Sequence, residues 1–318
     1  MEKISQPKVS IIIVTWNGKK YCFDLIDSLK KIKYKNYDII VVDNGSTDGI
    51  QKEFKKKYGK VATFIENKKN LGLAEGTNIG IRESIRRKSR YVLAMNQDLI
   101  VKPDFLDILV DAMERNLEVS VSGPKIYYME PKNMIWSAGC NYRIYGFKSR
   151  HQGEMEKGQD KKNMYVDAID CVLMLRNDVL KKHGLLDSKL FIVHELSEWA
   201  LRTKRFGYKA LYVPKSVVWH KVASSPIWYE ENPAFEKKSN ENETSIYYNI
   251  RNWLLVIKKN KNFPYYLLVL FLESTVFALI RAIKYTKSSK LYLMETYYIA
   301  IWHSLINKTP MELYPYKK

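Results

Sequence analysis

Three short clusters of polar residues, each directly behind an apolar run, hold side chains that could bind a polar ligand. They are residues 15–17 (Thr-Trp-Asn), 43–48 (Asp-Asn-Gly-Ser-Thr-Asp) and 96–98 (Asn-Gln-Asp). Their carboxylates, hydroxyls and amides can fix a heterocycle or a diol, or reach a phosphate group through a divalent cation. Because the carboxyl ends of parallel strands meet at one edge of a sheet, we expect the three clusters to converge on one crevice.

The apolar runs in front of these clusters are typical of buried parallel strands. The run at 9–14 is mostly β-branched, and apolar residues recur with helical spacing in the segments that follow the strands. This alternation predicts an α/β fold, with a mostly parallel sheet covered by helices on both faces. The expected strands are 9–14, 37–42, 61–66 and 91–95, and the expected helices are 21–32, one that begins near Ile50, and 76–87.

Beyond residue 118 the pattern weakens and then returns. Residues 119–165 are rich in Gly, Tyr and Lys, which indicates irregular strands and loops. Further on, regular elements are expected as strands at 172–175 and 210–213, a helix at 198–206, and three helices at about 243–258, 265–285 and 291–306.

The composition is that of a folded cytoplasmic chain attracted to phosphate-rich partners. Of 318 residues 46% are hydrophobic, and 53 Lys and Arg against 34 Asp and Glu give a formal charge of +19. Three widely spaced cysteines argue against a disulfide framework, and the first apolar run is too short for a signal peptide. No nucleic-acid-binding motif accompanies the positive charge, so we expect no nucleic-acid partner.

Four segments in this order resemble family-2 glycosyltransferases of the rhamnosyltransferase-like branch. They are Val-Ser-Ile-Ile-Ile-Val-Thr-Trp-Asn from Val9, Val-Val-Asp-Asn-Gly-Ser-Thr-Asp-Gly from Val41, Asn-Leu-Gly-Leu-Ala-Glu-Gly-Thr-Asn-Ile-Gly from Asn70, and Asn-Gln-Asp from Asn96. The resemblance extends over roughly residues 8–305. It implies a GT-A fold, a Rossmann-like sheet in which a nucleotide-diphosphate sugar lies across the carboxyl edge of the strands.

The resemblance also implies which residues line the nucleotide-sugar site. Asp43 would accept hydrogen bonds from the base or the ribose, although Asp-Asn-Gly taken alone is an ordinary tight turn. The segment at 70–80 could present backbone N–H groups to the donor at a helix start, or it could be a plain helix-entry loop. The expected nucleotide-sugar-binding residues are Thr15, Asn17, Asp43, Asn44, Ser46, Asn70, Gly72, Asn78 and Asn96.

Asp98 lies where the resembling family keeps the acidic residue that holds Mg²⁺ or Mn²⁺ against the diphosphate. A hard divalent cation prefers oxygen ligands, and neutralising the diphosphate makes it a better leaving group. The resemblance adds His220 as a second contact to the metal or the diphosphate. The alternatives are a helix cap for Asp98 and an ordinary packed side chain for His220.

Residues 191–202, Phe-Ile-Val-His-Glu-Leu-Ser-Glu-Trp-Ala-Leu-Arg, resemble the family's acidic segment that supplies the general base. Inverting transfer needs a carboxylate that accepts the proton of the attacking hydroxyl. Leu196 stands where the family often carries another carboxylate, so the sequence departs from the family pattern there. Glu195 is the first candidate and Glu198 the second, since three residues apart they share a helix face near its start. Glu198 could instead pair with Arg202, four residues along a helix.

The carboxyl-terminal helices mix aromatic and basic side chains, a combination suited to a lipid headgroup layer. The segment at 265–280 is almost wholly apolar, but Glu273 interrupts it and it is shorter than the roughly 20 residues of a spanning helix. We therefore expect peripheral contact with the inner face of the cell membrane. A soluble helical cap or a dimer interface is the alternative, which leaves a homo-oligomer open.

These features divide the chain into a catalytic domain at 1–228 and a helical, membrane-associating region at 229–318. The catalytic domain has a nucleotide-sugar half at about 1–118 and an acceptor half at about 119–228, where the resemblance places Asp170 and Arg176 near the acceptor and the donor sugar. The expected activity is transfer of a sugar, with rhamnose as a candidate, from dTDP-rhamnose or a UDP-sugar to a saccharide or lipid-linked acceptor in cell-surface polysaccharide biosynthesis. The alternative is a catalytically silent subunit that binds nucleotide-sugar or a partner glycosyltransferase, and donor turnover separates the two.

Overall fold

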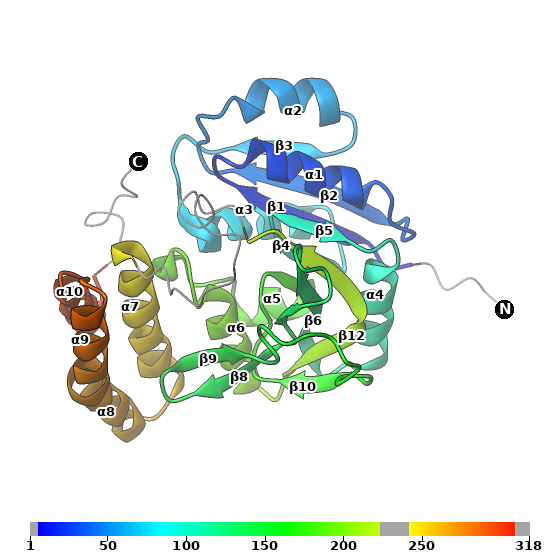
Figure 1. Cartoon of the computed structure of the whole chain (residues 1–318). Coiled ribbons are helices and arrows are strands. Elements are labelled where there is room, and N and C mark those ends of the chain that lie inside the picture. The colour runs from blue at the N-terminus through cyan, green and yellow to red at the C-terminus, as the bar shows by residue number, and fades with distance from the viewer. Residues whose placement is uncertain (1–5, 223–241, 309–318) are drawn as a thin grey trace.

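The computed structural model describes residues 6–222 and 242–308, and strands and helices alternate through its first part as the sequence predicts (Figure 1). This part contains β1 (Val9–Thr15), α1 (Lys19–Leu29), β2 (Tyr37–Asp43), α2 (Ile50–Tyr58), β3 (Thr63–Glu66), α3 (Gly72–Arg86), β4 (Tyr91–Asn96), β5 (Leu99–Val101) and α4 (Phe105–Arg115). The middle part contains β6 (Val119–Tyr128), β7 (Ile135–Ser137), β8 (Cys140–Arg143), β9 (Gly146–Ser149), β10 (Met164–Val166), β11 (Val172–Arg176), α5 (Asn177–His183), η1 (Ser188–Leu190), α6 (Glu195–Lys204) and β12 (Lys209–His220). The last part contains α7 (Glu243–Asn260), α8 (Phe263–Leu272), the π-helical turn η2 (Glu273–Phe277), α9 (Ala278–Lys287) and α10 (Leu293–Leu305).

A ten-stranded mixed sheet forms the centre of the molecule. Its main path is β10-β12-β6-β11-β4-β1-β2-β3, while β5 pairs with β12 and β7 pairs with β6. The half built from β1 to β4 is parallel, whereas β11 runs antiparallel to both of its neighbours, β4 and β6. Strands β8 and β9 form a separate hairpin.

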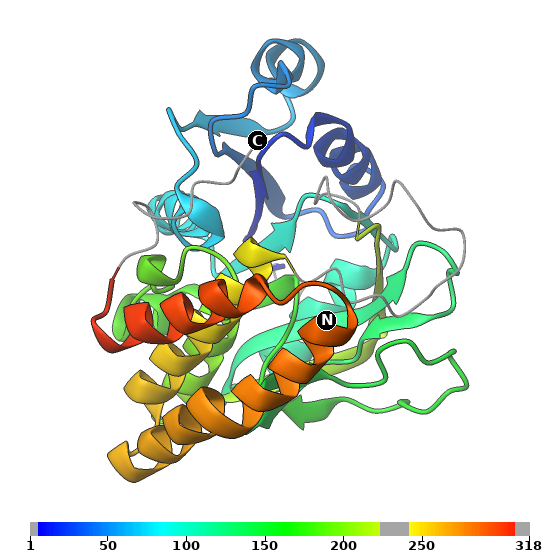
Figure 2. The same cartoon turned by 60° about the vertical axis from the view of Figure 1, so that its left-hand side comes forward.

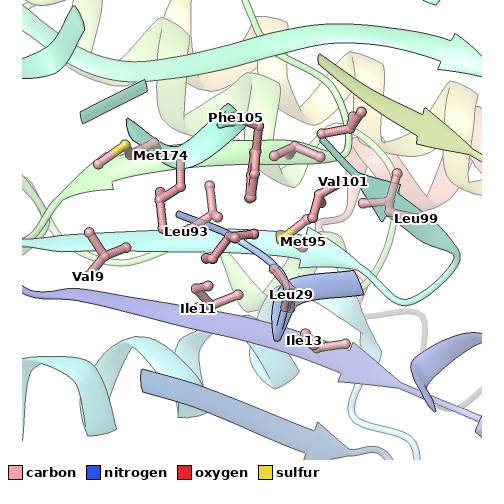
Figure 3. Close-up of a cluster of buried hydrophobic side chains, with 14 of the residues drawn as sticks. Val9, Ile11, Ile13, Leu29, Leu93, Met95, Leu99, Val101, Phe105 and Met174 are labelled. Carbon is pink, nitrogen blue, oxygen red and sulfur yellow. The ribbon is translucent and has the colours of Figure 1, made fainter. Parts of the chain in front are cut away.

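Alternate side chains of β1 enter two cores on opposite faces of the sheet, because successive residues of a strand point to opposite sides. Val9, Ile11 and Ile13 pack with residues of α1, α2 and α4, and Figure 3 shows this core between the strands and Leu29. Ile12 enters the other core, which includes residues of α3, α5 and α6. The largely apolar sequence of β1 is therefore explained by burial on both faces.

Helix α3 begins at Gly72, four residues before the start expected from the sequence. Gly72 has φ +84°, and a Cβ atom there would lie 2.5 Å from the ring of Phe191. Within the same helix, a Cβ on Gly80 would lie 2.4 Å from the side chain of Ile12. The glycines of this segment thus allow α3 to pack closely against the sheet and against the loop that precedes α6.

Helices α7 to α10 form a separate layer with its own apolar core, beside α6 and the β8–β9 hairpin (Figure 1). Figure 2 shows α8, η2 and α9 as one long helix. This helix, Phe263–Lys287, has 25 residues and is long and apolar enough to cross a membrane by length and composition. The expectation that the apolar segment is too short for a span is therefore wrong, and its placement at the membrane surface stays a prediction.

Glu273 does not interrupt the exposed apolar face of this long helix. Its side chain is fully buried, where its carboxylate accepts a hydrogen bond of 2.6 Å from the Tyr297 hydroxyl and pairs with Arg281 at 3.3 Å. The outer face is left to side chains such as Phe271 and Leu279, which are 61% and 63% exposed. The expected domain limit between residues 228 and 229 lies outside the described residues, so the division into domains stays a prediction.

Candidate active site

The ends of the first four strands lie side by side at one edge of the sheet. Thr15 pairs with Asp43 in the register of β1 and β2, Asp43 pairs with Glu66 of β3, and Val14 pairs with Asn96 of β4. The predicted convergence of the three polar clusters is therefore confirmed. It follows from the register of parallel strands, which sets their carboxyl ends in one row.

The first two clusters are joined by hydrogen bonds around the turn after β2. Asp43 is fully buried, and its carboxylate accepts bonds from the Ser46 hydroxyl, from the Ser46 N–H at 3.2 Å and from Gln51 Nε2 at 2.8 Å. Asn17 donates its N–H to Ser46 Oγ at 2.9 Å and accepts the Thr47 N–H on its side-chain oxygen at 2.7 Å. Asp43 thus organises the turn from inside, whereas Asn17 and Thr47 lie at the exposed rim of the crevice.

Thr15 and Asn44 are also engaged inside the protein. Thr15 donates its hydroxyl to Gln97 Oε1 at 2.6 Å, which ties the end of β1 to the cluster after β4. Asn44 donates to the Gly72 carbonyl at 3.0 Å, and its side-chain oxygen accepts from Asn67 Nδ2 at 3.0 Å. These residues hold the strand ends and the start of α3 together, and Gln97 is a member of this network that the sequence interpretation left without a role.

For the segment at 70–80 the sequence left two alternatives, a donor-binding segment or a plain helix-entry loop. Its polar groups bond to other parts of the protein. Asn70 Oδ1 accepts the Gly72 N–H at 2.9 Å, and the Ala74 N–H donates to the Phe191 carbonyl at 3.1 Å. Asn78 donates to the Leu186 carbonyl at 2.9 Å and accepts the Leu186 N–H at 3.0 Å. The helix-entry interpretation fits these contacts, and Asn78 in particular fastens α3 to the loop before η1.

Asp98 and His220 form a buried pair at the junction of β5 and β12. His220 Nε2 lies 3.1 Å from Asp98 Oδ1, and the two residues are 6% and 1% exposed. The edge of the Trp136 ring packs against the imidazole at 4.7 Å between centroids, and His220 Nδ1 is buried without a hydrogen-bond partner. One carboxylate and one imidazole are suitable donors for a divalent cation, but residues 6–222 and 242–308 hold no group of three or more potential ligands.

Glu195 is the first residue of α6, so this helix begins three residues before the start expected from the sequence. The side chain is 3% exposed, and its Oε2 is buried without a hydrogen-bond partner. Burial disfavours the charged carboxylate and raises the pKa of Glu195 to about 7. A carboxylate with this pKa can exchange a proton near neutral pH, which suits a general base. The neighbouring His194 is an ineffective base, because burial lowers its pKa to about 4.

Glu198, the second candidate base, is used in ion pairs. Its Oε2 lies 3.1 Å from Arg202 Nη2, and its Oε1 lies 3.0 Å from Lys259 Nζ of α7. The side chain is 1% exposed. The structural alternative, an i, i+4 pair with Arg202, is therefore observed, and Lys259 extends it into a contact between α6 and α7.

The thiol of Cys171 links the two sides of the site. It accepts a hydrogen bond from Asn96 Nδ2 at 3.2 Å. Burial, followed by the negative charges of Asp170 and Asp98 and a smaller effect of Glu195, raises the pKa of Cys171 well above its usual value. The segment before α6 also reaches the strand ends through the start of α3, because the Phe191 carbonyl accepts the Ala74 N–H at 3.1 Å and the Gly72 carbonyl accepts from Asn44 Nδ2 at 3.0 Å.

Asp170 and Arg176 were both expected to contact sugars, but Arg176 has a structural role. Arg176 is 5% exposed, and its guanidinium donates to the carbonyls of Val119 at 2.7 Å and Asn116 at 3.0 Å. The expectation that Arg176 lies near the sugars is therefore wrong. Asp170 is partly buried and accepts a hydrogen bond from the Ser137 hydroxyl at 2.6 Å.

The segment before Glu195 is strained and is held from outside the sheet. Phe191, Val193 and His194 have φ between +61° and +69°, which is costly for residues with side chains. Asn252 of α7 is fully buried, and its amide donates to the carbonyls of residues 190, 192 and 193 at 2.7, 2.7 and 2.9 Å. The sequence interpretation missed Asn252, since nothing local marks an asparagine whose partners lie about sixty residues away.

The glycosyl transferase family 2 model matches residues 10–184 of the chain. An uncharacterized glycosyltransferase of Haemophilus influenzae is 27% identical over 251 residues, which are 75% of this chain and 74% of the relative. The dTDP-rhamnosyl transferase RfbF of Shigella flexneri is 26% identical over 293 residues, which are 91% of this chain and 92% of that protein.

Two solved structures share the fold at low sequence identity. The crystal structure of GalNAc-T7 with UDP, GalNAc and Mn²⁺ superposes with a TM-score of 0.61 and 16% identity over 80% of this chain. The structure of S. aureus TarS superposes with a TM-score of 0.53 and 16% identity, also over 80%. This chain spans 48% and 40% of those two chains, and the likeness establishes a GT-A fold. With the family match over more than half of its length, the chain belongs to glycosyl transferase family 2 and is a nucleotide-sugar-dependent glycosyltransferase.

Proposed function

We propose that this glycosyltransferase inverts the anomeric centre and uses Glu195 as its general base. The observation that carries the proposal is the Glu195 carboxyl group at the start of α6, which is 3% exposed and has an Oε2 atom without a hydrogen-bond partner. Its burial raises its pKa to about 7. At neutral pH such a group is present both as the neutral acid, which is stable when buried, and as the carboxylate, which can accept a proton. Glu198 is a poor alternative because its carboxylate is already paired with two cations.

In the proposed reaction, an acceptor hydroxyl oxygen attacks the anomeric carbon of the donor sugar. The new bond joins this oxygen to the carbon, the bond from the carbon to the diphosphate oxygen breaks, and the bonding electrons leave with the nucleoside diphosphate. Glu195 takes the proton of the attacking hydroxyl. Attack opposite the leaving group gives the inverted product.

Asp98 and His220 are the residues that we propose to hold Mg²⁺ or Mn²⁺. Asp98 Oδ1 and His220 Nε2 lie 3.1 Å apart, and Nδ1 of His220 makes no hydrogen bond, so the neutral imidazole can carry its proton on one nitrogen and offer the other to a cation. When bound, the cation would neutralise charge on the leaving diphosphate. Two protein ligands leave the remaining positions to phosphate oxygens and water.

The donor is proposed to lie across the row of strand ends, with its nucleotide beside Asn17 and the turn after β2. Rhamnose from a dTDP donor is the first candidate sugar, supported by similarity to RfbF along 91% of the chain. The acceptor is proposed to be a saccharide or a lipid-linked saccharide of a cell-surface polysaccharide. Transfer would then take place at the cytoplasmic face of the membrane.

Membrane contact is proposed to use the outer face of the long helix, Phe263–Lys287. Leu279 and Ile283 on this face are 63% and 50% exposed. Replacing both by Glu should abolish sedimentation with anionic vesicles, because each large apolar side chain contributes about 2 kcal/mol when it leaves water. The matched control replaces Val61 and Leu117, which are 45% and 70% exposed elsewhere, and should leave binding unchanged. Equal sedimentation of both double variants would contradict this contact.

The decisive experiment measures release of nucleoside diphosphate by the purified chain. dTDP-rhamnose, UDP-glucose and UDP-N-acetylglucosamine are each supplied with Mn²⁺ or Mg²⁺, and thermal stabilisation is recorded in parallel. We expect one donor to be turned over and Glu195→Gln to bind it without turnover. Binding without turnover by the native chain would favour the silent-subunit alternative. If the native chain neither binds nor turns over any of the three donors, the proposed donor class is refuted.

A further inference from the structure

A cavity of about 280 Å³ lies where the β8–β9 hairpin, the start of α6 and the carboxyl-terminal helices meet. Tyr145 and Phe147 line it from the hairpin, His194 from the segment before α6, Trp253 from α7 and Arg281 from α9. The volume is near the lower end of the range for ligand pockets, about 300 Å³, and suits a single small ring. His194, which immediately precedes Glu195 in the chain, is part of the lining, so the cavity borders the segment that carries the proposed base.

The cavity has the mixture of surfaces that a sugar ring requires. The rings of Phe147, His194 and Trp253 lie within 5.9–6.1 Å of one another, and the Tyr145 side chain is 54% exposed at the rim. Aromatic faces pack against the C–H groups of a pyranose, while amide and guanidinium groups bond to its hydroxyls. Asn249, on the exposed side of α7, adds such an amide.

The charged groups around the cavity are balanced. Arg281 is held by the buried Glu273 carboxylate at 3.3 Å and lies 3.4 Å from the Tyr297 hydroxyl, so its guanidinium is oriented and largely neutralised. His194 is uncharged at neutral pH, because burial lowers its pKa to about 4. A site of this kind favours an uncharged polyhydroxyl ligand over a phosphate.

We infer that this cavity binds the acceptor, as an uncharged pyranose ring that packs on the aromatic side chains beside the segment that carries Glu195. The inference rests on the proposed function, since it assigns the second substrate of the same reaction. It also gives the carboxyl-terminal helices a part in the acceptor site, because α7 and α9 provide six of the ten lining residues.

The test uses the full chain and three probes: methyl α-rhamnoside, methyl β-glucoside and methyl β-galactoside. Binding is measured by saturation-transfer NMR for the native chain, Tyr145→Ala and Asn249→Ala. We expect at least one glycoside to bind and both variants to weaken its binding about fivefold or more. The control is Tyr292→Ala, which removes a tyrosine that is 59% exposed outside the cavity and should leave binding unchanged.

Absence of glycoside binding to the native chain, or equal binding by Tyr145→Ala and Tyr292→Ala, would overturn the inference. Donor turnover in water is measured on the same samples and separates this failure from failure of the proposed function. If the donor is hydrolysed while the cavity variants bind glycosides normally, the cavity assignment is wrong and the donor chemistry stands. If the cavity binds glycosides and no donor is turned over, the site is a saccharide site and the proposed reaction is wrong.

Discussion

Replacing Glu195 by Gln should increase the stability of the protein at alkaline pH while it abolishes transfer. The carboxyl group has a pKa of about 7 in the folded chain, against 4.5 as its ordinary value. The folded state therefore holds this proton more tightly than the unfolded state. The stability from this group is fully present below pH 4.5 and is lost as the pH rises through 7.

The magnitude follows from the difference between the two pKa values. Each pKa unit corresponds to about 1.4 kcal/mol, so native Glu195 lowers the free energy of unfolding by about 3 kcal/mol above pH 8. Glutamine has the same shape without the charge and avoids this cost. Between pH 5 and pH 8 the variant should gain about 2–3 kcal/mol relative to the native chain.

Urea unfolding of both proteins at several pH values measures this difference, and Glu66→Gln provides the control. Glu66 is exposed at the end of β3, so its replacement makes the same chemical change without burial. In the native enzyme, kcat/KM should rise about tenfold from pH 6 to pH 8 as Glu195 ionises. A stability difference that stays constant with pH, or a rate already at its plateau at pH 5, would refute the reasoning.

Three further substitutions separate the roles of the surrounding residues. Asn252→Leu should reduce kcat about tenfold or more with donor KM nearly unchanged, because the segment before Glu195 loses its hydrogen bonds to the Asn252 amide. Steady-state kinetics measure both constants. Glu198→Gln should destabilise the fold by about 3 kcal/mol in urea unfolding and retain turnover per folded molecule; a catalytic loss as complete as that of Glu195→Gln would reverse the assignment. Asp98→Asn should raise the Mn²⁺ concentration for half-maximal activity about tenfold or more, and an unchanged metal requirement would exclude Asp98 as a ligand.

Much of the row of strand ends, where we propose that the donor binds, was predictable because its signals are local. The apolar run of β1 indicates a strand buried on both faces, and the polar residues behind Thr15, Asp43 and Asn96 mark strand ends that the register then aligns. The start of α3 was expected too late. Gly72 lies in the left-handed region and packs against Phe191, a contact across more than a hundred residues that the spacing of apolar side chains does not reveal.

The catalytic side was less predictable because its decisive contacts are distant in the sequence. The helical pattern does not distinguish Glu195 from Glu198. In the structure Glu198 pairs with Lys259 of α7, whereas burial raises the pKa of Glu195. Arg176 resembled a ligand residue but bonds to backbone carbonyls within the protein. Glu273 looked like an interruption of an apolar helix until its partners placed it on the buried side.

The hydrogen bonds between α7 and the segment before Glu195 restrict how this enzyme can be recombined with its relatives. A hybrid whose crossover falls in the loop after α6, near Gly207, would combine residues 189–193 from one parent with Arg251 and Asn252 from the other. Such a hybrid would inherit mismatched halves of one hydrogen-bonded unit. A crossover at Gly184 keeps that unit intact, so the segment before Glu195 and helix α7 should be exchanged together.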